Sequence, residues 1–159
     1  MSEILVLSFG SNLGDRKYYL GAALKLMQQV LGEEPLELSS IIETKAVGFS
    51  GPDFLDMAAV FETNIPPLDV LSFCKDIERS LGRDEKLEYG PDGKRIYHDR
   101  TIDIDILFYG NLTLDTAELT LPHPQVFQRE YVSEMLQSLE LARPLLLSFK
   151  GKMCNFAGF

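Results

Sequence analysis

Two aspartates, Asp103 and Asp105, are the residues of this chain best suited to hold a metal ion. They lie in segment 100–107, RTIDIDIL, whose alternating apolar and acidic residues predict a β-strand. Successive strand side chains point to opposite faces, so both carboxylates would share one face, roughly 7 Å apart at the backbone. Ionised carboxylates there repel each other, and Mg²⁺ offsets this because it binds one or two carboxylates together with water and phosphate oxygens. The pattern indicates magnesium-assisted phosphate chemistry; the alternative is a solvated strand with two surface acids.

Cationic residues and a histidine accompany this pair along the sequence. Arg100 precedes Asp103 by three residues, His123 stands between two prolines, and Arg129 follows six residues later. Arginine binds phosphate through paired hydrogen bonds, and histidine can donate to a phosphate oxygen. Each of the three is also an ordinary surface or loop residue when taken alone. Their combination with the carboxylate pair favours a phosphate-binding site.

Two loops could contribute to such a site. Residues 10–16, GSNLGDR, join an expected strand to an expected helix, where backbone amides can favour an anion. The segment lacks the GxxxxGK[ST] pattern, and a plain turn capped by Ser11, Asn12 or Asp15 is favoured over an anion site. Residues 82–100 form a long polar loop with five basic and five acidic residues. Such a loop is either a lid that closes over phosphates or a solvated surface loop.

The overall composition limits the classes of function. The chain has 159 residues, 45% of them hydrophobic, which favours one domain (1–159) with a real core. Its net charge of −9 argues against a nucleic-acid partner. We expect no membrane span and no signal peptide, because apolar runs are short and the N-terminus reads as a strand. Two distant cysteines fit a reducing cytoplasm rather than a disulfide framework or zinc site.

The expected elements follow from hydrophobic periodicity and from glycine and proline positions. Strands are predicted at 3–9, 36–44, 54–62 and 101–109, and helices at 16–31, 67–81 and 127–141. The order strand, helix, strand, strand, helix, strand is the split βαβ pattern of ferredoxin-like α+β folds, an antiparallel sheet flanked by helices. Residues after Pro144 give no clear pattern.

Taken together, these segments resemble the family of 6-hydroxymethyl-7,8-dihydropterin pyrophosphokinases, enzymes of folate biosynthesis. The resemblance runs from about residue 4 to 132 in family order and leaves 133–159 unmatched. The matching segments are 10–16, the FLD triplet 54–56, Glu78 with Gly82 and Arg83, the RTIDIDIL strand, and LTLPHP at 119–124 followed by Arg129.

The resemblance implies a ferredoxin-like fold and an enzyme that transfers the β,γ-pyrophosphoryl group of ATP to the pterin's hydroxymethyl group, leaving AMP. It implies that two Mg²⁺ ions are held by Asp103 and Asp105, and we expect the enzyme to be a cytoplasmic monomer. It also implies three residue sets: catalytic Arg83, Arg100, Asp103 and Asp105; nucleotide-binding Glu78, Arg83, Arg100, Ile106, His123 and Arg129; and pterin-binding Thr44, Val47, Phe54, Asp56 and Tyr131.

The chain departs from the family pattern at a few positions. Asp56 stands where the family usually has asparagine, and Glu85 stands where a second basic residue is common. A carboxylate only accepts hydrogen bonds, but the pterin's ring N–H and 2-amino group are donors that it can serve. We therefore expect pterin binding with changed detail. Two alternatives stay open: another magnesium-dependent nucleotide enzyme on the same fold, and a non-catalytic acidic binding module.

Overall fold

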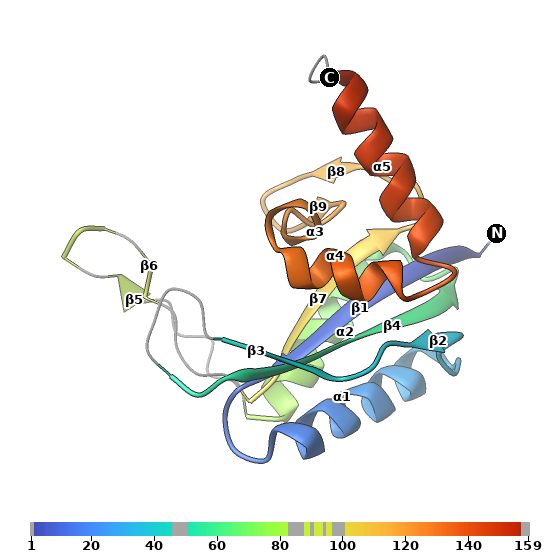
Figure 1. Cartoon of the computed structure of the whole chain (residues 1–159). Coiled ribbons are helices and arrows are strands. Elements are labelled where there is room, and N and C mark those ends of the chain that lie inside the picture. The colour runs from blue at the N-terminus through green and yellow to red at the C-terminus, as the bar shows by residue number, and fades with distance from the viewer. Residues whose placement is uncertain are drawn as a thin grey trace.

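The computed structural model describes residues 2–45, 51–82, 88–89, 91–93, 95–96 and 101–156. Its main feature is a five-stranded antiparallel sheet with helices on both faces (Figure 1). The elements are β1 (Glu3–Ser11), α1 (Arg16–Leu31), β2 (Glu37–Leu38), β3 (Ile42–Thr44), β4 (Phe54–Thr63), α2 (Pro67–Ser80), β5 (Glu88–Tyr89), β6 (Arg95–Ile96), β7 (Asp103–Tyr109), β8 (Leu114–Asp115), β9 (Thr120–Leu121), α3 (Gln125–Gln128), α4 (Glu130–Gln137) and α5 (Arg143–Phe156).

The central strand of the sheet is β1. It pairs antiparallel with β4 on one side and with β7 on the other, while β2 and β3 both pair with β4. With β2 and β3 taken together as the second strand, this is the order of a ferredoxin-like α+β fold. The predicted fold class is therefore confirmed.

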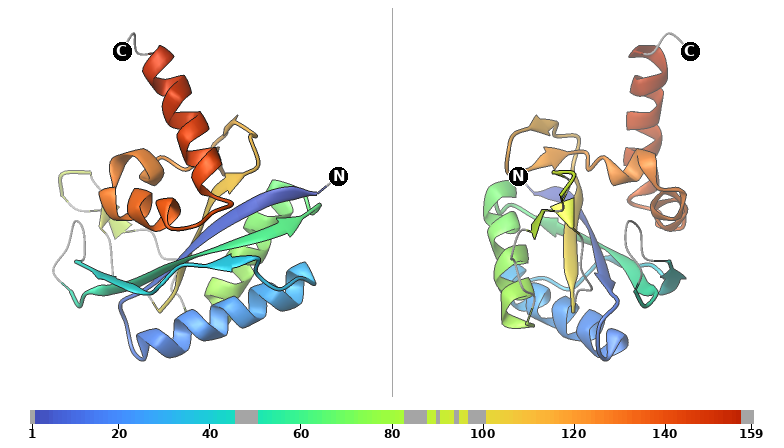
Figure 2. Two further views of the ribbon diagram at one scale, coloured as in Figure 1. Left: turned by 45° about the vertical axis from the view of Figure 1, so that its right-hand side comes forward. Right: turned by 90° about the vertical axis from the view of Figure 1, so that its left-hand side faces the viewer.

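The two faces of the sheet carry separate hydrophobic cores. Helices α1 and α2 cover one face, and the helices that follow β9 lie against the other (Figures 1 and 2). Strand alternation sends neighbouring side chains to different cores. The first core includes Leu7, Phe9, Leu20, Met27, Val70, Cys74, Ile104 and Ile106, and the second includes Val6, Val60, Leu107, Phe108, Val126, Leu136, Leu146 and Phe149.

A β-bulge in β7 changes which residues face the second core. Leu7 pairs with Ile106 and Val6 pairs with Phe108, so Leu107 is the extra residue between them. Leu107 and Phe108 consequently both join the second core, although they are consecutive. The helices that pack on these two residues are therefore anchored toward the C-terminal end of β7, away from Asp103.

Most of the predicted elements are confirmed. The structure places α1 at the predicted residues, because Asp15 accepts a hydrogen bond from the Tyr18 amide at 3.1 Å and Gly32 ends the helix at φ 70°. The strands at β1, β4 and β7 and the helix α2 also form, with ends that differ by one or two residues from those predicted. No helix in the described ranges is long and apolar enough to cross a membrane.

Two predicted elements were wrong as single units. The strand predicted at 36–44 is split into β2 and β3, because the Ser39 hydroxyl accepts from the Ala58 amide and donates to the Ser40 carbonyl. Such local side-chain bonds compete with the regular ladder. The helix predicted at 127–141 is split into α3 and α4 by Arg129, whose backbone is extended.

Helix α5 was not predicted at all. Pro144 at its second position and the spacing of Leu146 and Phe149 are the signals that could have revealed it. Phe149 stacks on Phe108 with ring centroids 5.6 Å apart, which fastens the middle of the helix to the sheet.

Candidate active site

The two aspartates of β7 lie on the same face of the sheet, as the alternation predicted. Both are half-buried, whereas Ile102, Ile104 and Ile106 are buried in the first core on the opposite face. The apolar alternate positions thus fix which way β7 faces, because a slip of one residue would bury both carboxylates among α1 and α2.

Asp56, Gly10 and Asp103 form one row across three adjacent strands. Gly10 of β1 pairs with Asp56 of β4 on one side and with Asp103 of β7 on the other. The two carboxylate-bearing residues are therefore two strand spacings apart, roughly 10 Å. A Cβ added to Gly10 would lie 2.9 Å from Oδ1 of Asp56 and 3.5 Å from the ring of Phe54. Glycine keeps the space between these residues open.

Asp56 is a nearly buried carboxylate, only 9% exposed. Its Oδ2 accepts a hydrogen bond of 2.6 Å from the Thr44 hydroxyl, and no other described residue hydrogen-bonds to the carboxyl group. Burial raises the pKa of Asp56 from 3.8 to about 6, and the negative charge of Asp103 adds to the rise, while the Thr44 bond and Arg129 oppose it.

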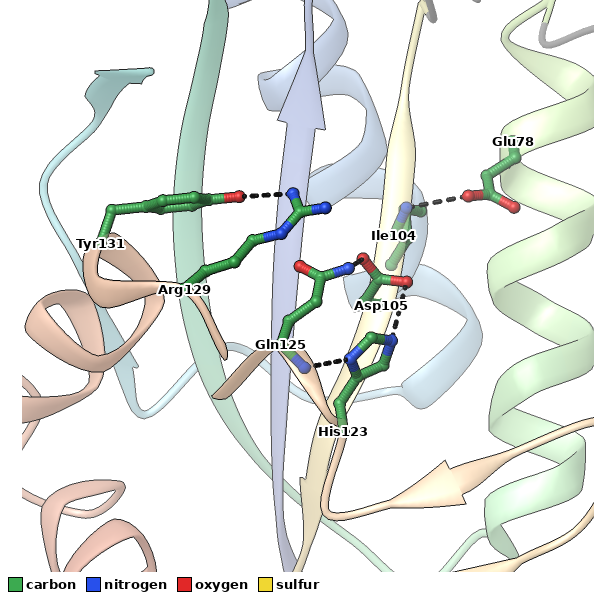
Figure 3. A network of polar contacts seen from close by, with 7 residues as sticks. All are labelled: Glu78, Ile104, Asp105, His123, Gln125, Arg129 and Tyr131. Carbon is green, nitrogen blue, oxygen red and sulfur yellow. Dashed lines mark hydrogen bonds and ion pairs between the residues drawn. The ribbon is translucent and has the colours of Figure 1, made fainter. Parts of the chain in front are cut away.

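His123, in the loop after β9, and Gln125, the first residue of α3, both approach Asp105 (Figure 3). Nε2 of His123 is 3.6 Å from Oδ1 of Asp105, and the Gln125 side-chain amide donates to Oδ2 at 3.3 Å. Nδ1 of His123 accepts from the Gln125 backbone amide at 3.1 Å. Burial lowers the pKa of His123, and the positive charge of Arg129 opposes protonation further, against the attraction of Asp103. The ring is therefore neutral at neutral pH.

Arg129 and Tyr131 form the far side of this cluster (Figure 3). The guanidinium donates to the Tyr131 hydroxyl at 3.4 Å. The extended backbone that splits the predicted helix places Arg129 at the junction of α3 and α4. Burial raises the pKa of Tyr131, and Asp56 adds to the rise against the lowering by Arg129. Asp56 of β4 thus interacts electrostatically with Arg129 and Tyr131 of the α3–α4 segment.

Glu78 lies on the other side of β7, on helix α2 (Figure 3). Its Oε2 accepts the backbone amide of Ile104 at 2.8 Å, and the side chain is buried. This amide therefore points away from β1, and in an antiparallel ladder the backbone groups of Ile106, two residues on, point the same way. Glu78 therefore satisfies an amide at the edge of β7 and fixes the position of the strand, while its part in nucleotide binding stays a prediction.

A cavity of about 310 Å³ opens along this edge of β7. Asp105, Ile106 and His123 line it together with residues 116–120 around the β8–β9 turn and Leu71 of α2. The His123 amide donates to the Leu107 carbonyl at 3.0 Å, so the loop that carries the histidine is tied to the bulge. The cavity combines apolar walls with one imidazole and two carboxylates, those of Asp105 and Glu118.

The turn at 10–16 has a supporting role here. Asp15 caps α1, which confirms the capped strand–helix turn favoured from the sequence. Asn12 donates to the Pro52 carbonyl at 3.1 Å and Arg16 to the Asp53 carbonyl at 2.8 Å. These bonds hold the chain that leads into Phe54 and Asp56.

Three predicted site residues, Val47, Arg83 and Arg100, lie outside the described residues, as does most of the loop at 82–100. Sequence reasoning missed Gln125, whose only signal was its position two residues after His123. It also missed Gly10 as the spacer between Asp56 and Asp103.

The donor set at β7 fits Mg²⁺ better than a metal held by protein alone. No group of three or more His, Cys, Asp or Glu side chains that could hold a metal occurs among the described residues. A site with two carboxylates leaves the remaining positions of a magnesium octahedron to water and phosphate oxygens, which is how Mg²⁺ is usually bound in phosphate-transfer enzymes. Three aspartates on one face also provide the negative charge that a cation would neutralise.

Comparisons with known proteins agree with this geometry. The family model for 7,8-dihydro-6-hydroxymethylpterin-pyrophosphokinase matches residues 6–141. A 2-amino-4-hydroxy-6-hydroxymethyldihydropteridine pyrophosphokinase of Porphyromonas gingivalis is 44% identical over 131 residues, covering 81% of this chain and 85% of the relative. The Bacillus subtilis enzyme of the same name is 34% identical over 145 residues, covering 88% and 82%.

A solved structure described as HPPK-DHPS in complex with substrates has the same fold. It superposes with a TM-score of 0.64 at 14% identity, over 99% of this chain and 45% of that longer chain.

Proposed function

The chain belongs to the 7,8-dihydro-6-hydroxymethylpterin-pyrophosphokinase family, and we propose that Asp103, Asp105 and the residues around them form its active site. The activity is transfer of a pyrophosphoryl group from ATP to 6-hydroxymethyl-7,8-dihydropterin in folate synthesis. The observation that carries the assignment of the site is the row of Asp56, Gly10 and Asp103. This row places the proposed pterin pocket around Asp56 next to the carboxylate pair of β7. A transfer between two bound substrates requires that their sites be adjacent in this way.

Asp103 and Asp105 would hold the magnesium that the family uses with ATP, and the number that we propose is two ions. When bound, these ions supply neutralisation of charge on the phosphates and orientation of the reacting oxygens. The two carboxylates share one face, and Asp105 already has donors directed at each of its oxygens. The chain thus offers fixed ligands that need little rearrangement.

The nucleotide would occupy the cavity along the edge of β7. The outward backbone groups of Ile106 can hydrogen-bond to the edge of the adenine ring, since no described strand pairs with that side of β7. His123 would donate to a phosphate from Nε2, and Arg129 would add positive charge next to the carboxylates. We propose the same phosphate-binding role for Arg83 and Arg100, as arginines suited to paired hydrogen bonds with phosphate.

The pterin would lie over Gly10, between Phe54 and Tyr131. Aromatic side chains suit a flat heterocycle, and the missing Cβ at Gly10 leaves room for it. Asp56 would accept from the ring N–H and the 2-amino group through its carboxylate, which the Thr44 hydroxyl holds in place. We propose Val47 as a further contact on the pterin's polar edge.

We also propose that residues 1–159 act as one catalytic domain in the cytoplasm. The burial of Leu146 and Phe149 of α5 in the second core supports including the segment beyond the family match. The reduced, buried Cys74 is compatible with a reducing compartment. A monomer stays our prediction, and analytical ultracentrifugation would check it.

The decisive experiment follows the nucleotide product. Purified protein is incubated with Mg²⁺, ATP and 6-hydroxymethyl-7,8-dihydropterin, and AMP and ADP are separated by chromatography. The proposal predicts AMP in equal amount to the pterin diphosphate, and its loss when either Asp103 or Asp105 becomes asparagine. ADP as the product would contradict the transfer, and normal AMP formation by both variants would contradict the site.

A further inference from the structure

Gln125 contacts both His123 and the proposed metal ligand Asp105, through different parts of the same residue. Its backbone amide donates to Nδ1 of His123, and its side-chain amide donates to Oδ2 of Asp105 (Figure 3). We propose that Gln125 is a positioning residue that sets the tautomer of His123 and the orientation of the Asp105 carboxylate. The part that concerns Asp105 rests on the metal role proposed above.

The backbone contact determines where the imidazole carries its proton. A backbone N–H can only donate, so Nδ1 must present a lone pair, and the proton of the neutral ring is left on Nε2. Nε2 is the nitrogen that lies 3.6 Å from Oδ1 of Asp105, and the histidine lines the cavity along β7. The histidine is thereby prepared to donate on the side where phosphate would be bound.

The side-chain contact acts on the carboxylate. Oδ2 of Asp105 accepts from Gln125 at 3.3 Å, while Oδ1 faces the Nε2 proton of His123. The Gln125 hydrogen bond limits rotation of this carboxylate about its Cβ–Cγ bond. Outer hydrogen bonds of this kind orient metal ligands, and removing one commonly weakens metal binding 10–100-fold.

The backbone around Gln125 is well anchored, which a positioning role requires. The next residue, Val126, is buried in the second core, and the His123 amide is bonded to the Leu107 carbonyl of β7. Gln128, at the other end of α3, is exposed to solvent and provides a matched control on the same helix.

The metal half of the proposal is tested with Mn²⁺ alone, measured by electron paramagnetic resonance on protein without nucleotide. Gln125→Leu removes the amide at similar volume, and Gln128→Leu is the control. We expect Gln125→Leu to weaken Mn²⁺ binding about tenfold and to raise the Mg²⁺ concentration for half-maximal AMP formation, with the KM for the pterin unchanged. Gln128→Leu should bind Mn²⁺ as the unmodified protein does.

The Asp105→Asn variant distinguishes a failure of the metal role proposed for Asp105 from a failure of the positioning role proposed for Gln125. If this variant binds Mn²⁺ normally, the metal role of Asp105 fails and the carboxylate half of the inference fails with it. If Asp105→Asn loses Mn²⁺ but Gln125→Leu binds it as well as Gln128→Leu, only the role of Gln125 is overturned. A higher KM for the pterin in Gln125→Leu would also overturn it, because a positioning effect on Asp105 leaves the pterin pocket alone.

The tautomer half is tested by ¹⁵N NMR of the imidazole rings. The chain has only two histidines, His98 and His123, so a His123→Asn sample assigns the signals. We expect Nε2 of His123 to be protonated in the unmodified protein and in Gln125→Leu, because the leucine keeps the backbone amide. A proton on Nδ1 would overturn this half of the proposal whatever the Mn²⁺ result.

Discussion

Replacing Asp56 by asparagine tests how much a buried carboxylate destabilises the folded protein. The folded state holds the Asp56 proton up to a pKa of about 6, whereas the unfolded chain releases it near 3.8. Between these values the folded protein binds more protons than the unfolded one. The free energy of unfolding therefore falls as the pH rises from about 4 to about 6, and the loss remains constant at higher pH.

The size of the effect follows from the pKa difference. A rise from 3.8 to about 6 corresponds to about 3 kcal/mol, because one pKa unit is worth about 1.4 kcal/mol. At pH 5 roughly half of this loss is present, and at pH 7 nearly all of it. Asparagine removes the charge but keeps an oxygen that can accept the Thr44 hydroxyl, so Asp56→Asn should be more stable than the unmodified protein by up to about 3 kcal/mol at pH 7.

The measurement is urea unfolding at pH 5, 6, 7 and 8, followed by far-ultraviolet circular dichroism because the chain has no tryptophan. The advantage of Asp56→Asn should grow from pH 5 to pH 7 and then level off. Asp53→Asn, an exposed aspartate just before β4, is the control and should give no such dependence. A difference between Asp56→Asn and the unmodified protein that is the same at all four pH values would refute the reasoning.

Substitutions at four further residues test other parts of the site. Asp103→Asn and Asp105→Asn should each slow AMP formation by at least about a hundredfold with an unchanged dichroism spectrum, and a near-normal rate would exclude the metal role. Glu78→Ala should lower the free energy of unfolding by about 1–3 kcal/mol in urea titrations, because the Ile104 amide loses its buried acceptor, whereas Glu78→Gln keeps one. Gly10→Ala should raise the KM for the pterin but not the KM for ATP, since the added Cβ would lie 2.9 Å from Oδ1 of Asp56. A pterin KM equal to that of the unmodified protein would contradict this.

The parts of the fold that the sequence predicted are those with local causes. Helix α1 was placed at 16–31 because Asp15 at its start and Gly32 at its end act within one turn of the chain. The facing of Asp103 and Asp105 was predicted because strand alternation is a property of consecutive residues. These features depend on no partner elsewhere in the sequence.

The parts that were missed depend on pairing between distant segments. The alignment of Asp56, Gly10 and Asp103 is a matter of register between three strands, which no local pattern reveals. The contact of Gln125 with Asp105 likewise requires the loop after β9 to be bonded to β7. Sequence reasoning therefore identified most of the proposed site residues but could not show which of them are neighbours.

Asp103, Asp105 and Leu107 lie on one face of the sheet by strand alternation, and the bulge in β7 adds Phe108 to that face. Because Leu107 and Phe108 both turn toward the second core, the covering helices are anchored at one end of the strand, and the end with Asp103 and Asp105 keeps partial exposure. The carbonyl of the extra residue, Leu107, accepts a hydrogen bond from the His123 amide. This bond holds the imidazole between the covered end of β7 and the end that carries the two aspartates. One added residue in β7 thus contributes both to the anchoring of the core and to the placement of a donor beside Asp105, which makes the bulge part of the proposed active site rather than an irregularity of the sheet.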